Sequence, residues 1–178
     1  MPGSARLLLR DATADWHEQV DRRFADVDLA DRNHYCRFLA AHAAALLPIE
    51  LALDAANVAA VVPDWPLRRR GQLIREDLTA LGRPLPSLEP VPVLGGPAAI
   101  IGAVYVLEGS RLGGTVLSRQ VGPGLPKRYL AGNRQASWQH LVALIDRLLA
   151  TPEDVAAATA AACDVFATFD RGGQRHLS

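Results

Sequence analysis

The sequence predicts an all-α fold in a single domain. The chain has 178 residues, of which 49% are hydrophobic and 21% charged, enough to bury a core without disulfides or metal. Apolar residues recur at helical intervals along most of the chain. No alternating strand pattern of convincing length and no repeat of fixed period interrupts them. We therefore expect one multi-helix domain over residues 1–178, with about seven helices.

The first two expected helices lie in the N-terminal third. One covers about residues 4–24, with apolar or small side chains on one face at Leu9, Thr13, Trp16, Val20 and Phe24. The next begins after Asp31, a good N-cap, and is expected to stop at Pro48. A shorter helical piece follows over residues 49–60.

The middle of the chain alternates helix and loop. Leucine and isoleucine recur over residues 67–81, and Gly82 suits a left-handed C-cap. Repeated prolines over residues 83–97 exclude a regular helix, although Pro97 suits the first turn of the next one. That next helix is expected from Ala98 to about Arg119.

Two more helices complete the predicted fold. Helical periodicity returns over residues 138–150. Thr151 then offers a hydroxyl N-cap, followed by a proline at the first position and an acid at the third. This last helix is expected to run to Gly172 and Gly173, with His176 in a frayed tail.

Charge and composition limit the classes of partner and compartment. Lysine plus arginine and aspartate plus glutamate both number 19, which gives no argument for a nucleic-acid or membrane-surface partner. The N-terminus lacks a secretory apolar region, and the apolar run 93–107 is too short to span a bilayer. We expect a cytoplasmic protein without a membrane segment, in which Cys36 and Cys163 are reduced, buried thiols.

The stretch YVLEGSRLGG, residues 105–114, is unusual for a helix. Gly109 and Gly113 each cost roughly 1 kcal/mol relative to alanine in a helix interior, and Gly114 follows directly. The spacing favours two explanations equally. Either another helix packs closely here, or a flat, rigid ligand lies against the helix where the Cβ atoms are missing.

Five histidines are candidates for catalysis or metal binding, and His17 has the most suitable neighbouring residues. Asp21 lies four residues on, so its carboxylate can accept one ring N–H and leave the other nitrogen free for a metal. An ordinary surface hydrogen bond explains the same pair. His34 and His42 are not at a ligand-pair spacing and are expected to be structural, while His140 and His176 lack suitable neighbours.

Considered together, two motifs resemble the haem oxygenase family. They are LLLRDATADWHEQVD near the N-terminus and YVLEGSRLGG in the middle. The match is closest to the bacterial branch that accompanies bacteriophytochromes, and SWQHLVALIDRL and CDVFATFD resemble the family's final helices more weakly. The resemblance implies an all-α haem oxygenase-like fold that holds haem between a proximal and a glycine-rich distal helix.

The resemblance also implies roles for individual residues. His17 becomes the proximal iron ligand, Asp21 the carboxylate that orients it, and Arg10 a partner for a haem propionate. The distal wall with the catalytic role becomes Gly109, Ser110 and Gly113, with Gly114 beside them in the haem-binding set.

The implied reaction is oxidation of haem by O2 and reducing equivalents to biliverdin, carbon monoxide and iron. Haem is then both substrate and cofactor. The implied partners are an electron donor, such as a ferredoxin or a flavin reductase, and a bacteriophytochrome that accepts biliverdin.

Three departures from the family pattern bear on the site. Ser110 stands where the mammalian-type branch has an aspartate, so proton delivery is expected to use serine, backbone and water. Arg111 replaces a small hydroxyl residue and is expected to face solvent. Cys163 and Ala167 stand where basic propionate partners are found in the mammalian-type branch. The basic residues of a later loop are alternative partners, although a solvated turn is the better reading: Lys127, Arg128 and Arg134.

Two other classes of function remain as alternatives. One is a haem- or tetrapyrrole-binding protein on the same scaffold that does not turn its ligand over. The other is a di-iron oxidase, which needs inward carboxylates and histidines such as Glu-x-x-His, and the sequence contains no such set.

Overall fold

A computed structural model describes residues 4–133 and 135–178. Over these ranges the chain forms helices and loops and no strand, which confirms the all-α fold in a single domain. The helices are α1 (Ala5–Ala12), α2 (Ala14–Phe24), α3 (Arg32–Ala55), η1 (Val58–Ala60), α4 (Trp65–Arg68), α5 (Gly71–Ala80), α6 (Gly96–Leu117), α7 (Arg128–Ala131), α8 (Trp138–Leu148) and α9 (Pro152–Leu177).

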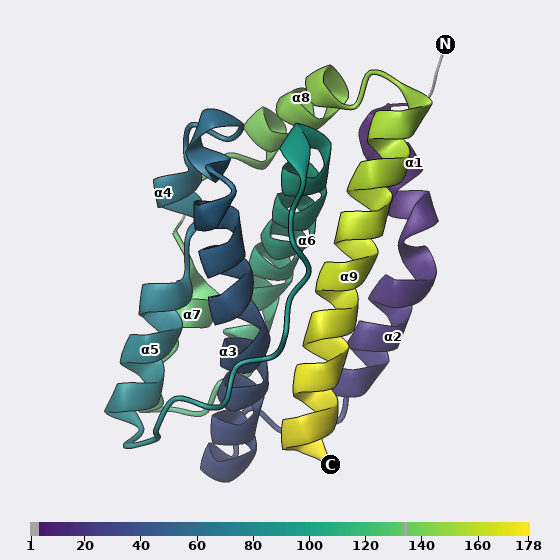
Figure 1. Ribbon diagram of the computed structural model, residues 1–178. Helices are drawn as coiled ribbons and strands as arrows, with labels where there is room; N and C mark the ends of the chain where they lie inside the picture. Colours follow the sequence, from purple (N-terminus) through teal and green to yellow (C-terminus); the bar gives the residue numbers. More distant parts are fainter. Residues whose placement is uncertain (1–3, 134) are drawn as a thin grey trace.

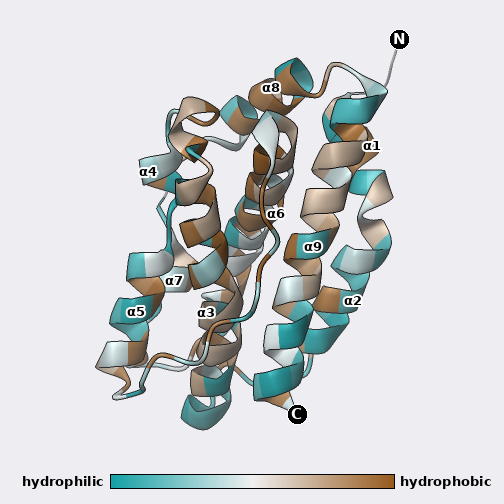
Figure 2. Cartoon of the chain, in the orientation of Figure 1, coloured by the Kyte–Doolittle hydropathy of each residue, from teal (hydrophilic) through white to brown (hydrophobic). Residues whose placement is uncertain are grey.

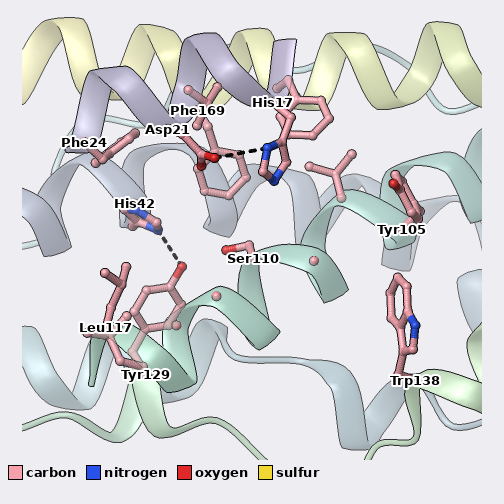
Figure 3. A pocket seen from close by; sticks show the side chains of 17 residues that line it. His17, Asp21, Phe24, His42, Tyr105, Ser110, Leu117, Tyr129, Trp138 and Phe169 are labelled. Carbon is pink, nitrogen blue, oxygen red and sulfur yellow. Dashed lines mark hydrogen bonds and ion pairs between the residues drawn. The ribbon is translucent and has the colours of Figure 1, made fainter. Parts of the chain in front are cut away.

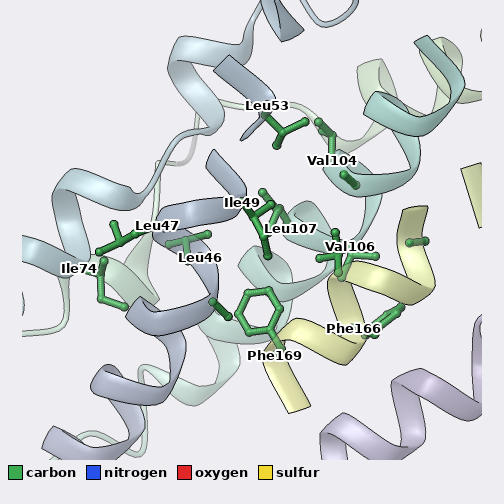
Figure 4. Close-up of a cluster of buried hydrophobic side chains, with 14 of the residues drawn as sticks. Leu46, Leu47, Ile49, Leu53, Ile74, Val104, Val106, Leu107, Phe166 and Phe169 are labelled. Atoms are coloured by element: carbon green, nitrogen blue, oxygen red, sulfur yellow. The ribbon is translucent and has the colours of Figure 1, made fainter. Parts of the chain in front are cut away.

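Three long helices, α3, α6 and α9, form the centre of the molecule (Figure 1). Helices α1 and α2 pack along α9, α5 packs on α3, and α8 lies across one end. Leucine, isoleucine, valine and phenylalanine side chains from the three central helices meet in one cluster (Figure 4). Polar residues prevail on α2 and at the C-terminal end of α9 (Figure 2).

The first expected helix is divided at Thr13. The Thr13 hydroxyl donates to the carbonyl oxygen of Leu9 at 2.8 Å, and the residue is buried. A threonine hydroxyl that bonds back to the fourth preceding carbonyl often bends a helix. Helix α2 therefore starts in a new direction at Ala14 and carries His17.

The prediction that a helix stops at Pro48 is wrong, because α3 continues to Ala55. A proline inside a helix leaves the carbonyl four residues earlier without its usual donor. Here that carbonyl belongs to Ala44, and it accepts the backbone N–H of Glu89 at 2.8 Å. The loop before α6 thus satisfies the group that the proline leaves free.

The helix expected over residues 67–81 is also divided, into α4 and α5. The buried Glu50 carboxylate accepts the backbone N–H groups of Arg70 and Gly71 at 2.7 and 3.0 Å. These bonds cap a new helix at Gly71. The predicted left-handed C-cap at its other end is confirmed, since Gly82 has φ = 67°.

The predicted N-caps are confirmed, but the last helix ends later than expected. Asp31 accepts the N–H of His34, and Thr151 forms a capping box with Asp154. Helix α9 continues through Gly172 and Gly173 to Leu177, so His176 lies in a helix rather than a frayed tail. A Cβ on Gly172 would lie 2.5 Å from the carbonyl oxygen of Ala41, so this glycine lets α9 approach α3 closely.

Helices α3 and α6 are long and apolar enough to cross a membrane, by length and composition alone. However, 67% and 56% of their most apolar windows are buried inside the protein. That burial is what the core helices of a soluble protein show.

Candidate functional site

A cavity of about 480 Å³ opens between α2 and α6. Helices α3 and α9 close it from behind, while α7 and α8 add residues at its two ends (Figure 3). The wall is mostly apolar and aromatic. Its lining residues are His17, Val20, Asp21, Phe24, His42, Tyr105, Val106, Gly109, Ser110, Gly113, Gly114, Leu117, Tyr129, Leu130, Trp138, Phe166 and Phe169.

The glycine pair of α6 forms an open part of this wall. A Cβ placed on Gly109 or Gly113 would meet no atom within 4 Å among the described residues, apart from chain neighbours and the helix's own backbone. Gly114 differs, because its Cβ would lie 3.3 Å from the Leu130 carbonyl oxygen. Close helix packing therefore does not explain Gly109 and Gly113, and the space beside them is free for a flat ligand.

His17 lies on α2, on the side of the cavity opposite Ser110 (Figure 3). Its Nδ1 lies 3.1 Å from an oxygen of Asp21, one helical turn on, and its ring packs edge-on against Phe166. Because Asp21 occupies Nδ1, the second ring nitrogen, Nε2, is available to a ligand in the cavity. The His17 side chain is 62% exposed, so a ligand can reach it from the open side.

Ser110 lines the cavity together with Gly109 and Gly113, and its hydroxyl contacts the buried Arg70. The Arg70 Nη2 donates to the Ser110 hydroxyl at 3.3 Å and to the Leu107 carbonyl oxygen at 3.0 Å. Arg70 is only 2% exposed. The serine is thus tied to a positive charge that the sequence pattern did not reveal.

His42 and Tyr129 are cavity residues that the sequence analysis missed. His42, expected to be structural, lines the cavity, and its Nδ1 lies 2.7 Å from the Tyr129 hydroxyl (Figure 3). Burial, together with the nearby charge of Arg70, lowers the pKa of His42 to about 3. The ring is therefore neutral at physiological pH. Spacing along α3 could not signal this role, because the partner lies 87 residues away.

Arg10, expected to meet a haem propionate, and Arg111, expected to face solvent, lie in surroundings that differ from these predictions. Arg10 pairs with Asp11 at 2.8 Å, is exposed, and is not among the cavity-lining residues. The prediction that Arg111 faces solvent is wrong: it is 6% exposed and its Nη2 lies 3.0 Å from Glu108. The same carboxylate pairs with Arg68, which also pairs with Asp64, so two arginines and two carboxylates balance one another.

The remaining candidates lie away from the cavity. Lys127 and Arg128 are exposed residues beside a shallow basic surface hollow, while Arg134 lies outside the described residues. His140, thought to lack neighbours, has its Nδ1 3.2 Å from an Asp64 oxygen. Cys36 is buried and Cys163 half-buried, and both are free thiols.

The cavity fits haem better than a bare metal ion. Over residues 4–133 and 135–178, no group of three or more histidine, cysteine, aspartate or glutamate side chains could hold a metal. Haem supplies the other equatorial ligands itself and needs one protein nitrogen, which His17 can give. The apolar walls and the space beside Gly109 and Gly113 suit a flat macrocycle.

Comparisons with known proteins agree with this assignment. No protein-family model matches the sequence. The chain is 35% identical over 146 residues to a haem oxygenase of Xanthomonas campestris, covering 78% of this chain and 88% of that protein. It is 28% identical over 152 residues to haem oxygenase PigA of Pseudomonas aeruginosa, covering 79% and 76%.

The fold comparison finds a solved structure with the same fold. A crystal structure of the NO- and CO-bound haem oxygenase from Neisseria meningitidis superimposes with a TM-score of 0.85 at 22% identity. The match covers 99% of this chain and 93% of that one. At this identity the likeness shows the fold, and the Xanthomonas relative shows the family. The chain belongs to the haem oxygenase family.

Proposed function

We propose that residues 1–178 form one haem oxygenase domain that binds haem through His17 and oxidises it to biliverdin, carbon monoxide and iron. The observation that carries this proposal is the pairing of His17 on α2 with the open glycine wall of α6 across one cavity. Haem and O2 are the substrates of this family, and bound haem supplies the iron chemistry that activates oxygen.

The residues of α2 hold and orient the substrate. The Asp21 carboxylate lies 3.1 Å from Nδ1 of His17 and would accept its proton, which would fix the tautomer and leave Nε2 to bind the haem iron. Phe166 supports the imidazole ring from its edge at a centroid distance of 5.9 Å. Arg10 remains our candidate for a propionate partner. It would have to exchange its exposed contact with Asp11 for the propionate, at little cost in water.

The residues of α6 shape the opposite wall. Gly109 and Gly113 leave room for the macrocycle and O2, while the Ser110 hydroxyl offers a polar group next to that space. Ser110 accepts a hydrogen bond from the buried Arg70, which holds the hydroxyl at the cavity wall. Gly114 keeps the helix close to α7, which forms one end of the cavity.

The site of action and the protein partners are part of the proposal. We infer a cytoplasmic enzyme that receives electrons from a ferredoxin or a flavin reductase. A bacteriophytochrome is the proposed acceptor of biliverdin. The electron donor is tested by mixing the purified haem complex with each candidate reductase and comparing the rates of haem loss. The biliverdin acceptor is tested by measuring transfer of the product to an apo-phytochrome.

Single turnover tests the function directly. The haem complex, mixed with O2 and a reductant, should lose its Soret band and yield biliverdin identified by chromatography. A ferrous haem complex that persists unchanged under these conditions would show a binding protein and would overturn the enzymatic proposal.

The ligand assignment has its own test, because the cavity contains two histidines. His17→Ala should remove the axial nitrogen from the ferric spectrum, and added imidazole should restore it. His42→Gln is the matched control and should keep the axial ligand. The assignment is wrong if these two results are exchanged.

A further inference from the structure

His42 is held in one orientation by four aromatic rings. Phe38 stacks on it with a centroid distance of 4.3 Å. Phe24, Tyr129 and Phe169 approach with their rings steeply inclined, at 4.8, 5.5 and 5.4 Å. The half-buried ring keeps its remaining surface toward the cavity that it lines. Its orientation is therefore fixed before any ligand binds.

Tyr129 connects His42 to a buried positive charge. The phenol is fully buried, and its hydroxyl lies 2.7 Å from Nδ1 of His42. The Arg70 guanidinium lies over the tyrosine ring at 4.7 Å and also donates to Ser110. Its Nη1 is buried without a hydrogen-bond partner among the described residues. The cation thus faces a chain of polar groups that runs from Ser110 through Tyr129 to His42.

The charge determines the direction of the hydrogen bonds in this chain. Burial raises the pKa of Tyr129, while Arg70 and the Ser110 hydroxyl oppose that rise by favouring the phenolate. A group that stabilises the phenolate does so by donating a hydrogen bond to the phenol oxygen or by placing positive charge near it, so the oxygen acts as the acceptor. Its single O–H is then left to donate to Nδ1 of His42. A neutral imidazole that accepts at Nδ1 carries its proton on Nε2.

We propose that Arg70, Ser110 and Tyr129 fix the Nε2–H tautomer of His42, which donates a hydrogen bond to the diatomic ligand bound on the haem. His42 then acts on the ligand, and Tyr129 and Arg70 are positioning residues that act through it. This inference rests on the proposed function, because it requires haem in the cavity.

The two ends of the cavity present different side chains to a ligand. The end formed by Tyr105 and Trp138 presents a pair of aromatic rings 6.2 Å apart (Figure 3). The end formed by His42 and Tyr129 presents a fixed donor.

Nuclear magnetic resonance of the apoprotein tests the tautomer without any haem. Imidazole ¹⁵N shifts of His42 should show a protonated Nε2 and an accepting Nδ1 in the wild type. Tyr129→Phe removes one hydroxyl while keeping the ring, and the shifts should then report a mixture of tautomers. A wild-type His42 protonated on Nδ1 would overturn the proposal.

The haem complex tests the donor, with carbon monoxide and azide as probes. His42→Leu should raise the CO stretching frequency of the ferrous complex and weaken azide binding to the ferric complex by roughly fivefold, the effect of one neutral hydrogen bond. Tyr129→Phe should shift both in the same direction by less. His42→Gln, which keeps an amide donor, should restore part of each.

Tyr35→Phe is the matched control, since it removes a phenol hydroxyl from a tyrosine that is not among the cavity-lining residues and that donates to the Pro126 carbonyl oxygen. It should leave the CO frequency and azide affinity unshifted. If His42→Leu binds haem but leaves both probes unchanged, His42 is a packing residue and the inference fails. If the wild type binds no haem, the proposed function itself fails, while the tautomer result still stands.

Discussion

The two halves of α6 use glycine for opposite purposes. In the first half, a Cβ on Gly102 would lie 2.8 Å from the Cα of Ala158, so α9 occupies the space that this glycine leaves. In the second half, a Cβ on Gly109 or Gly113 would meet no atom within 4 Å among the described residues outside its own stretch of helix. One helix thus packs against protein at one end and is open to a ligand at the other. The same residue type can mark a tight contact or a cavity, and only the surroundings distinguish them.

The glycine-rich half of α6 is held in place by contacts on its side away from the cavity. Glu108 and Arg111 lie outside the cavity lining and join Arg68 in a buried ion network. Arg68 and Arg111 also donate to backbone carbonyl oxygens of Ser137 and Ala136, just before α8. The network therefore fastens the glycine-rich half of α6 to the segment that carries Trp138.

The largest expected effect comes from removing that support. Glu108→Ala leaves two buried guanidinium groups without their shared carboxylate, and we expect a loss of about 3–5 kcal/mol in unfolding free energy. For a domain of this size the melting temperature should fall by roughly 6–20 °C. Glu18→Ala, which removes one partner of an exposed pair, is the control and should change it little. Equal effects would mean that the network does not hold α6.

Gly102→Ala tests the packed half. The new methyl group would overlap the α9 backbone, which cannot move without disturbing the core. We expect a destabilisation of about 3 kcal/mol, measured by urea unfolding of the apoprotein. Full stability in this variant would contradict the close approach of α6 and α9.

The pH dependence of stability tests the enclosed histidine beside the open half. The pKa of His42 is about 3 in the folded protein and near 6.5 when unfolded, so the unfolded chain binds the extra proton between these values. The stabilisation is complete above pH 6.5 and is lost as the pH falls toward 3. Relative to His42→Gln, the wild type should lose about 2 kcal/mol between pH 6.5 and 4.5. Parallel curves for the two proteins would show that His42 is accessible to protons.

Gly109→Ala should have the smallest effect and the opposite sign. Its methyl group would meet no described atom within 4 Å outside the adjoining helix backbone, so the gain in helix propensity should raise the unfolding free energy of the apoprotein by about 1 kcal/mol. Thermal unfolding should show an increase of roughly 2–4 °C. A decrease like that of Gly102→Ala would remove the distinction between the two halves.

Local signals in the sequence were sufficient for much of the fold. Caps at Asp31 and Thr151 and the turn at Gly82 act within a few residues, and each is found where the sequence predicts it. The wrongly predicted helix ends are those set by groups that are distant in the sequence. Glu89 satisfies the carbonyl that Pro48 leaves free, and Glu50 caps α5 from another helix.

The site was predictable to the extent that its residues lie in continuous motifs. His17 with Asp21 and the glycines of α6 each lie within one helical segment, and the structure brings both segments to one cavity. His42, Tyr129 and Arg70 come from three separate helices or their flanks, and no spacing connects them. Arg111 was assigned to solvent because Arg68 and the Ala136 carbonyl, which enclose it together with Glu108, lie far away in the sequence.

Haemin titration of Gly109→Leu tests most directly whether the open half of α6 is the wall of the haem site. The leucine side chain should enter the cavity, leave the apoprotein folded, and weaken haemin binding by roughly tenfold or more, equivalent to at least about 1.4 kcal/mol. Val116→Leu places the same side chain on α6 outside the cavity lining and should bind haemin like the wild type. Unchanged affinity and an unchanged Soret spectrum in Gly109→Leu would contradict the account.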